Sequence, residues 1–234
     1  FFFGVKPHLA IGTDLLFAAF TKMGGTVSLA RQRLVPWKVV GQLCAGSIPA
    51  ALLALWALKA MGPASGTAQS IMTTTLGFAL LLTAAATLYK AIAFSAQRQA
   101  DEAAARKAHA GDPTRPRHWS LPVLLGAVIG TLVTFTSVGA GAIGVTVLLL
   151  VYPLLPLPRI IGADIAYAVP LTLVAGLGHA SLGSVDWPLL AQLLAGSLPG
   201  IWLGSRLVTR TPERLIRSAL SVLLAWAGFK LILI

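Results

Sequence analysis

The sequence predicts an all-α, polytopic membrane protein built from two inverted repeats, and three observations lead to this prediction. Of the residues, 56% are hydrophobic and only 11% are charged, which is too little polar side chain to cover a surface that faces water. Apolar runs long enough to cross a bilayer recur along the chain. A shift of 150 residues places Ile11-Gly12-Thr13-Asp14 on Ile161-Gly162-Ala163-Asp164, and Trp37 on Trp187, without a gap. A duplicated unit in so apolar a chain is typical of transporters.

The apolar runs predict six transmembrane helices, three in each repeat. A helix rises about 1.5 Å per residue, so about 20 apolar residues cross the hydrocarbon core. The runs that meet this length cover residues 9–29, 39–61, 68–93, 160–179, 188–207 and 215–234.

A further apolar segment, residues 121–151, is too long for one untilted helix and contains the glycine-rich stretch 137–144. Glycines at this density favour a break in a membrane helix, so we expect two half-helices that form a re-entrant hairpin. With a hairpin, all Lys and Arg residues other than Lys22 lie on one side of the membrane, except Lys6, Lys59 and Lys230. A straight crossing would instead move Arg159 and the arginines of 206–217 to the opposite side. The sharper asymmetry favours the hairpin, because the basic loops of membrane proteins face the cytoplasm.

We expect residues 1–94 to form the first transmembrane repeat, residues 95–119 a cytoplasmic linker, and residues 120–234 the second repeat. The chain opens on Phe1-Phe2-Phe3, and Phe1 corresponds to Val151 in the repeat. The first repeat is therefore expected to be incomplete at its N-terminus and to lack most of its own hairpin. The same charge pattern predicts that the loops 95–119 and 206–217 are cytoplasmic.

Asp14, Asp164 and Lys22 carry charge inside predicted spans, where a charge costs about 2.5–3.5 kcal/mol and needs a partner or a polar interior. Asp14 and Asp164 are repeat partners and are the candidates for ion coupling. Burial disfavours a charged carboxyl, so either residue could carry a coupling proton. Alternatively, each caps a helix that starts at a short unwound step around Gly12 or Gly162. Lys22 follows Asp14 by about two helical turns, and it either neutralises an anionic solute or pairs internally.

The predicted break is a candidate binding site for the solute. The free N–H groups of the half-helix that follows a break carry partial positive charge, which suits an anion. Thr136 and Ser137 can add hydroxyl donors beside Gly139 and Gly141, and Gly144 is a further break position. The alternative is that these small residues serve close helix packing.

Prolines recur at equivalent positions of the two repeats and predict helix kinks. Gly46-Ser47-Ile48-Pro49 corresponds to Gly196-Ser197-Leu198-Pro199, and a proline within a helix removes a backbone hydrogen bond. We interpret Pro49 and Pro199 as symmetric bends around a central cavity. His179, which ends a predicted span, is interpreted as an interfacial packing residue.

The chain resembles the sulfite exporter TauE/SafE family, also called the toluene sulfonate uptake permease family, over essentially its whole length. The residues that carry the resemblance in the second half are Val138-Gly139-Ala140-Gly141, Gly162-Ala163-Asp164, Gly183-Ser184-Val185-Asp186-Trp187, Gly196-Ser197-Leu198-Pro199-Gly200 and Leu203-Gly204-Ser205-Arg206. In the first half they are Gly12-Thr13-Asp14, Trp37 and Gly46-Ser47-Ile48-Pro49. The resemblance implies a multi-pass permease of the bacterial inner membrane for sulfite, sulfonates or sulfoacetate, driven by an ion gradient.

These inferences together predict a secondary transporter that works by alternating access and is not an enzyme. The expected solute-binding residues are Thr13, Lys22, Ser47, Thr136, Ser137, Gly139, Gly141 and Ser197. Expected partners are the small sulfur-containing anion and the lipid bilayer, with a coupling proton or cation and a homodimeric copy as further candidates. No motif for a cofactor, a metal or a nucleotide is found, and the basic residues lie in loops rather than on a face for nucleic acid. The alternatives from other classes are an anion channel, a non-transporting receptor and an intramembrane aspartyl protease.

Overall fold

The computed structural model describes residues 6–62, 65–77, 79, 114, 120–138, 141–152 and 155–208. All regular secondary structure within these ranges is helical, which confirms the all-α prediction for this part of the chain. The chain divides into two compact units, Phe1–Leu190 and Ala191–Ile234, and each is described by itself. Two described helices, Trp37–Met61 and Leu157–Ser181, are long and apolar enough to cross a membrane, and Leu121–Thr136 is a shorter apolar helix.

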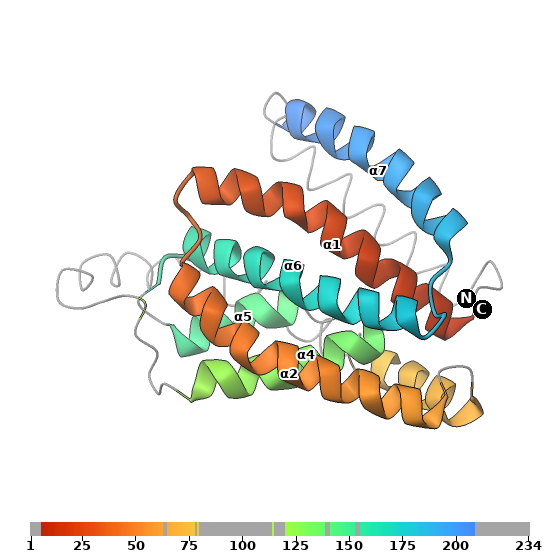
Figure 1. Ribbon diagram of the computed structural model, residues 1–234. Helices are drawn as coiled ribbons and strands as arrows, with labels where there is room; N and C mark the ends of the chain where they lie inside the picture. Colours follow the sequence, from red (N-terminus) through yellow and green to blue (C-terminus); the bar gives the residue numbers. More distant parts are fainter. Residues whose placement is uncertain are drawn as a thin grey trace. The chain divides into compact units, whose positions relative to one another are not determined.

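The helix boundaries repeat with the same 150-residue spacing as the sequence (Figure 1). Helix α1 spans Pro7–Arg31 and helix α6 spans Leu157–Ser181, so both ends of the two helices correspond. Helix α2 spans Trp37–Met61, and helix α7 spans Trp187–Val208 with an equivalent start. A proline lies within the first two positions of both α1 and α6, where its missing N–H is not needed.

The turns that follow α1 and α6 also correspond. Arg33 has φ 58° and Gly183 has φ 70°, and these two residues are 150 positions apart. Glycine adopts this left-handed conformation at no steric cost, whereas an L side chain such as that of arginine is strained there. The repeat has therefore kept the backbone of the turn although the residue differs.

The predicted break in the segment 121–151 is present. Helix α4 spans Leu121–Thr136 and helix α5 spans Ala142–Val151. Helix α4 lies along α2 in the same direction, because Gly126 contacts the backbone of Leu43 and Gly130 contacts that of Ser47.

After the break the chain turns back toward the start of α4. Tyr152, the residue that follows α5, donates a 2.6 Å hydrogen bond from its hydroxyl to Gln42 Oε1. Gln42 is next to Leu43, which contacts Gly126 near the beginning of α4. The segment thus ends close to the level at which it began, as Figure 1 also shows.

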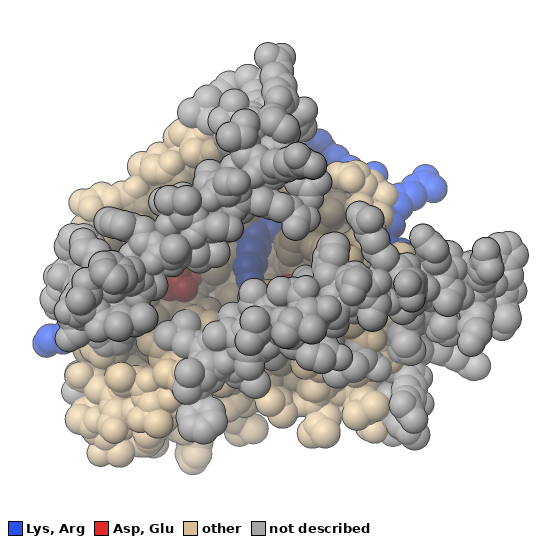
Figure 2. Space-filling view, turned by 180° about the vertical axis from the view of Figure 1, so that it is seen from behind, with Lys and Arg blue, Asp and Glu red and all other residues tan. Residues whose placement is uncertain are grey.

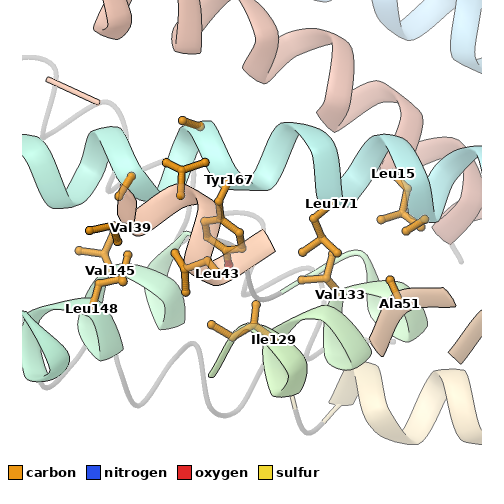
Figure 3. Close-up of a cluster of buried hydrophobic side chains, with 14 of the residues drawn as sticks. Leu15, Val39, Leu43, Ala51, Ile129, Val133, Val145, Leu148, Tyr167 and Leu171 are labelled. Atoms are coloured by element: carbon orange, nitrogen blue, oxygen red, sulfur yellow. The ribbon is translucent and has the colours of Figure 1, made fainter. Parts of the chain in front are cut away.

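One apolar cluster joins α1, α2, α4, α5 and α6 (Figure 3). Its members include Leu15 from α1, Leu43 from α2, Val133 from α4, Leu148 from α5 and Leu171 from α6. The contacts of α1 with α6 and of α2 with α4 are the most extensive in this unit. The core therefore holds the broken helix against the two repeat-related helices.

Part of the predicted span pattern lies outside the described residues. The predicted runs 9–29, 39–61, 160–179 and 188–207 fall within α1, α2, α6 and α7. Of the run 68–93, residues 68–77 and 79 are described and are helical. The run 215–234, most of the linker 95–119 and most of the loop 206–217 lie outside the described residues.

Candidate functional site

The break places Ser137 against the first of the two repeat-related aspartates. Ser137 Oγ donates a hydrogen bond of 2.7 Å to Asp14 Oδ2 of α1. Ser137 is the residue that ends α4, and its φ of 58° is left-handed. Such strain in a non-glycine residue persists where the surrounding contacts hold it, and here the bond to the carboxylate is one of them.

The side chain of Thr136 closes the end of α4. Its hydroxyl oxygen lies 2.7 Å from the carbonyl oxygen of Leu132 and accepts a hydrogen bond of 3.1 Å from the N–H of Val138. This arrangement supplies a partner to a backbone donor just beyond the helix. Thr136 is buried, and its observed role is to shape the break.

A pocket of about 190 Å³ opens beside Asp14. Asp14, Thr136 and Ser137 line it together with Met72 and Thr73, which belong to the helical residues 66–77. The charged residue in this pocket is a carboxylate, so the pocket suits a proton or a cation better than an anion.

The other side of the break contacts the second aspartate. Asp164 of α6 is only 3% exposed, and its carboxylate lies against Gly144 in the first turn of α5. A Cβ atom at Gly144 would overlap Asp164 Oδ1 and would lie 3.6 Å from the hydroxyl of Tyr167. The absence of a side chain at Gly144 therefore permits the carboxylate to reach the start of α5.

Lys22 of α1 is close enough to both aspartates to interact electrostatically with each of them. It is half-buried on α1, three residues before Gly25, and a Cβ atom at Gly25 would lie 3.6 Å from the side chain of Ile165 of α6. Residues three apart share a helix face, so the lysine points toward α6. Figure 2 shows basic atoms with acidic atoms on either side of them on this side of the molecule.

His179 differs from the interfacial residue that the sequence suggested. It is fully buried, and its Nε2 lies 3.0 Å from the carbonyl oxygen of Thr134 in α4. The contact links α6 to the last turn before the break, so His179 helps to fix the position of the break.

Other candidate residues have structural surroundings. Thr13 is buried, and its Oγ1 accepts a hydrogen bond of 2.9 Å from the N–H of Asp186. Ser47 is buried where α2 meets Gly130 of α4. Gly141 has φ 131° and precedes α5, whereas Gly139 lies outside the described residues.

Pro49 lies inside α2 and Pro199 lies inside α7, and each helix continues on both sides of its proline. Pro49 and Pro199 are both exposed. Ser197, in the second unit, lies 3.5 Å from the carbonyl oxygen of Leu194 and so has a partner within its own helix.

Gly12 and Gly162 lie inside unbroken helices rather than at unwound steps. The alternative that Asp14 and Asp164 cap helices does not fit, because each lies about two turns into α1 or α6. A Cβ atom at Gly12 would overlap the carbonyl oxygen of Ser184, and one at Gly162 would overlap that of Leu34. These glycines permit the close approach of a helix to the turn of the other repeat.

Tyr167 is a residue that sequence reasoning missed. Its hydroxyl is buried and has no hydrogen-bond partner among the described residues. Figure 3 shows its ring extending from α6 toward Leu43 and Ile129. The sequence feature that could have identified it is its position three residues after Asp164, which places both side chains on one face of the helix.

The described part of the chain is helical and includes two helices long and apolar enough to cross a membrane, which is the architecture of a helical membrane protein. Over residues 1–231 the chain matches the family described as "Sulfite exporter TauE/SafE", and it belongs to this family. The resemblance that the motifs indicated is thereby confirmed.

Relatives from Bacillus subtilis (strain 168) support this assignment. The probable membrane transporter protein YjnA is 32% identical over 238 residues, which cover 98% of this chain and 87% of the relative. The probable membrane transporter protein YdhB is 22% identical, with 98% of this chain and 86% of the relative covered. For the probable membrane transporter protein YunE the identity is 25%, with 87% and 71% covered. No solved structure matches the chain.

Proposed function

We propose that the protein is a secondary transporter that carries a small sulfur-containing anion, of the sulfite, sulfonate or sulfoacetate type, across the bacterial inner membrane. Transport proceeds by alternating access and is coupled to an ion gradient. One observation carries the proposal: the break between α4 and α5 contacts both repeat-related aspartates, at Ser137 and at Gly144, and Lys22 interacts electrostatically with both of them.

The contacts of the two repeats support an inverted arrangement. Gly12 meets the turn at Ser184, and Gly162 meets the turn at Leu34. The two contacts are equivalent, because Gly162 is the repeat partner of Gly12 and Ser184 is the repeat partner of Leu34, each 150 positions apart. Helices α1 and α6 run in opposite directions (Figure 1). We infer a pseudo-two-fold axis in the plane of the membrane, with α4 and α5 as a re-entrant hairpin beside it.

Three groups favour an anion near the start of α5. The first N–H groups of this helix have no partner within the helix and carry partial positive charge. Lys22 adds a full positive charge, and the Tyr167 hydroxyl adds a donor. An anion held by an ammonium and by backbone N–H groups is a common arrangement at interrupted membrane helices.

The burial of the two aspartates supports alternating access. Asp14 is exposed, whereas its repeat partner Asp164 is buried. In a symmetric carrier that opens to one side at a time, equivalent residues are expected to differ in access in this way. The exchange of the two environments constitutes the transport cycle.

The proposal is tested by uptake of a labelled sulfonate into proteoliposomes in which the proton or sodium gradient is set independently. We expect gradient-driven accumulation by the wild type, a loss of at least tenfold in Lys22→Gln, and little change in Lys59→Gln. Lys59 is exposed at the end of α2 and serves as the matched control. Flux that never exceeds equilibration of the solute would indicate a channel, and no flux of any sulfur anion would refute the proposal.

A further inference from the structure

We propose that the carboxylate of Asp164 occupies the place of the solute's anionic group when the transporter is empty, and that protonation of Asp164 opens this place to the solute. The inference rests on the proposed function and deepens it, because it assigns the coupling proton to one residue. It also predicts that proton binding and anion binding are linked one to one.

The position of the carboxylate carries the first step. It lies against Gly144, within the first turn of α5, where the helix has unpaired N–H groups. The first hydrogen bond within this helix runs from the N–H of Val145 to the carbonyl oxygen of Gly141, at 3.0 Å. The N–H groups of the first turn before Val145 therefore have no acceptor within the helix. Negative charge is stabilised at such a helix start, whether it belongs to a side chain or to a solute.

Tyr167 supplies an independent indication that a ligand binds here. Its side chain is fully buried, and its hydroxyl has no partner among the described residues although it lies 3.6 Å from the Cβ position of Gly144. A buried hydroxyl without an acceptor costs free energy and calls for an explanation. An oxyanion at the start of α5 would accept its hydrogen bond.

Lys22 explains why the solute and the carboxylate compete. The ammonium group interacts electrostatically with Asp164 on the neighbouring helix as well as with Asp14 on its own helix. A solute anion at the start of α5 would lie next to the buried carboxylate of Asp164, and two adjacent negative charges in a buried site are strongly unfavourable. The anion therefore enters once Asp164 has taken up a proton.

The groups around Asp164 leave it as the residue that changes charge. Lys22 approaches from α1, Cys44 of α2 interacts with Tyr167, and α6 itself carries Arg159 and Tyr167. The described helices α4 and α5 contain no titratable residue. Asp164 is the carboxyl group of this set and is therefore our candidate for the proton. When one proton and one monovalent anion are bound, the net charge of the site is the same as in the empty state.

The test measures the affinity of purified full-length protein for p-toluenesulfonate as a function of pH. This probe keeps one negative charge throughout, so any pH dependence belongs to the protein. For one linked proton, we expect the Kd of the wild type to fall about tenfold for each unit that the pH is lowered, until Asp164 is protonated in the free protein. Asp164→Asn imitates the protonated residue and should bind with a Kd that changes less than twofold over the same range. Asp14→Asn should retain the slope.

The outcomes separate the two levels of the proposal. Binding by the wild type without a pH slope, or an unchanged slope in Asp164→Asn, would overturn the role of Asp164 and leave anion transport intact. A slope lost in Asp14→Asn and kept in Asp164→Asn would assign the proton to the other repeat. Absence of binding of p-toluenesulfonate, sulfoacetate and sulfite at any pH would refute the proposed function itself. A wild type without a pH slope overturns the role of Asp164 by itself, so the proposal stays falsifiable even if a variant does not fold.

Discussion

Replacing Gly12 or Gly162 with alanine should destabilise the protein, although alanine is the better helix former. At both positions the new Cβ would overlap a backbone carbonyl oxygen in the turn of the other repeat, Ser184 for Gly12 and Leu34 for Gly162. A carbonyl in a tight turn cannot move as a flexible side chain can, so the helix must shift away from the turn. Overpacking of this kind costs about 1–3 kcal/mol.

Gly24 provides the matched control within α1. Among the described residues, no heavy atom lies within 4 Å of a Cβ placed at Gly24, which is exposed. Gly24→Ala should therefore gain about 0.5–1 kcal/mol from helix propensity. The expected difference between Gly12→Ala and Gly24→Ala is about 1.5–4 kcal/mol.

Thermal unfolding of the purified variants in one detergent measures this difference, at about 2–4 °C for each kcal/mol in a chain of this size. Because the contacts of Gly12 and Gly162 are equivalent, the two variants should lose similar stability. Melting of Gly12→Ala and Gly162→Ala at or above the temperature of Gly24→Ala would show that helix and turn do not approach closely. It would also remove the argument that the two repeats make equivalent contacts.

Three further predictions follow from single residues. Gly144→Ala should weaken binding of a sulfonate at least tenfold in a titration, because its Cβ would overlap the carboxylate of Asp164, and unchanged affinity would contradict the placement of α5. Arg33→Gly should raise the free energy of unfolding by about 1 kcal/mol, since it relieves a left-handed φ of 58°, and a lower melting temperature would argue against this turn. Thr13→Ala should lower the free energy of unfolding by about 1–3 kcal/mol, because it leaves the N–H of Asp186 without its acceptor. Thr13→Ser keeps the hydroxyl and should recover most of that loss in the same melting experiment.

The periodic features of the sequence predicted the fold well. The spacing of 150 residues anticipated both ends of α1 and α6 and the starts of α2 and α7, because related sequences in the same solvent end their helices at the same turns. The glycines of 137–144 predicted the break between α4 and α5, since a helix without side chains at several positions loses conformational preference.

Contacts between distant residues could not be predicted from one sequence. Ser137 was expected to face an anionic solute, yet it donates to Asp14, a residue 123 positions away. Gly12 and Gly162 were expected at unwound helix starts, whereas each sits in a helix that presses on a turn of the other repeat. These pairings depend on how the helices pack, which composition and local spacing do not specify.

The two repeats also differ in a way that only the structure makes visible. Thr13 accepts a hydrogen bond from the N–H of Asp186, and the equivalent positions are Ala163 and Pro36. Alanine has no acceptor, and proline has no N–H to donate. The contact of α1 with the turn after α6 therefore has a hydrogen bond that the equivalent contact of α6 with the turn after α1 cannot form. We expect the free energy needed to separate helix and turn to be higher at the first contact than at the second.

The central claim is that the two repeats are inverted, with the break between α4 and α5 as a turning point, and side-specific cysteine labelling tests it most directly. In a Cys44→Ala background, single cysteines at Ala110 in the linker and at Thr211 in the loop 206–217 would be probed with a membrane-impermeant thiol reagent in intact cells and in inside-out vesicles. We predict that both positions react only in the inside-out vesicles, which places both loops in the cytoplasm. Labelling of Ala110→Cys and Thr211→Cys from opposite sides would mean that residues 121–151 cross the membrane and that the repeats are parallel.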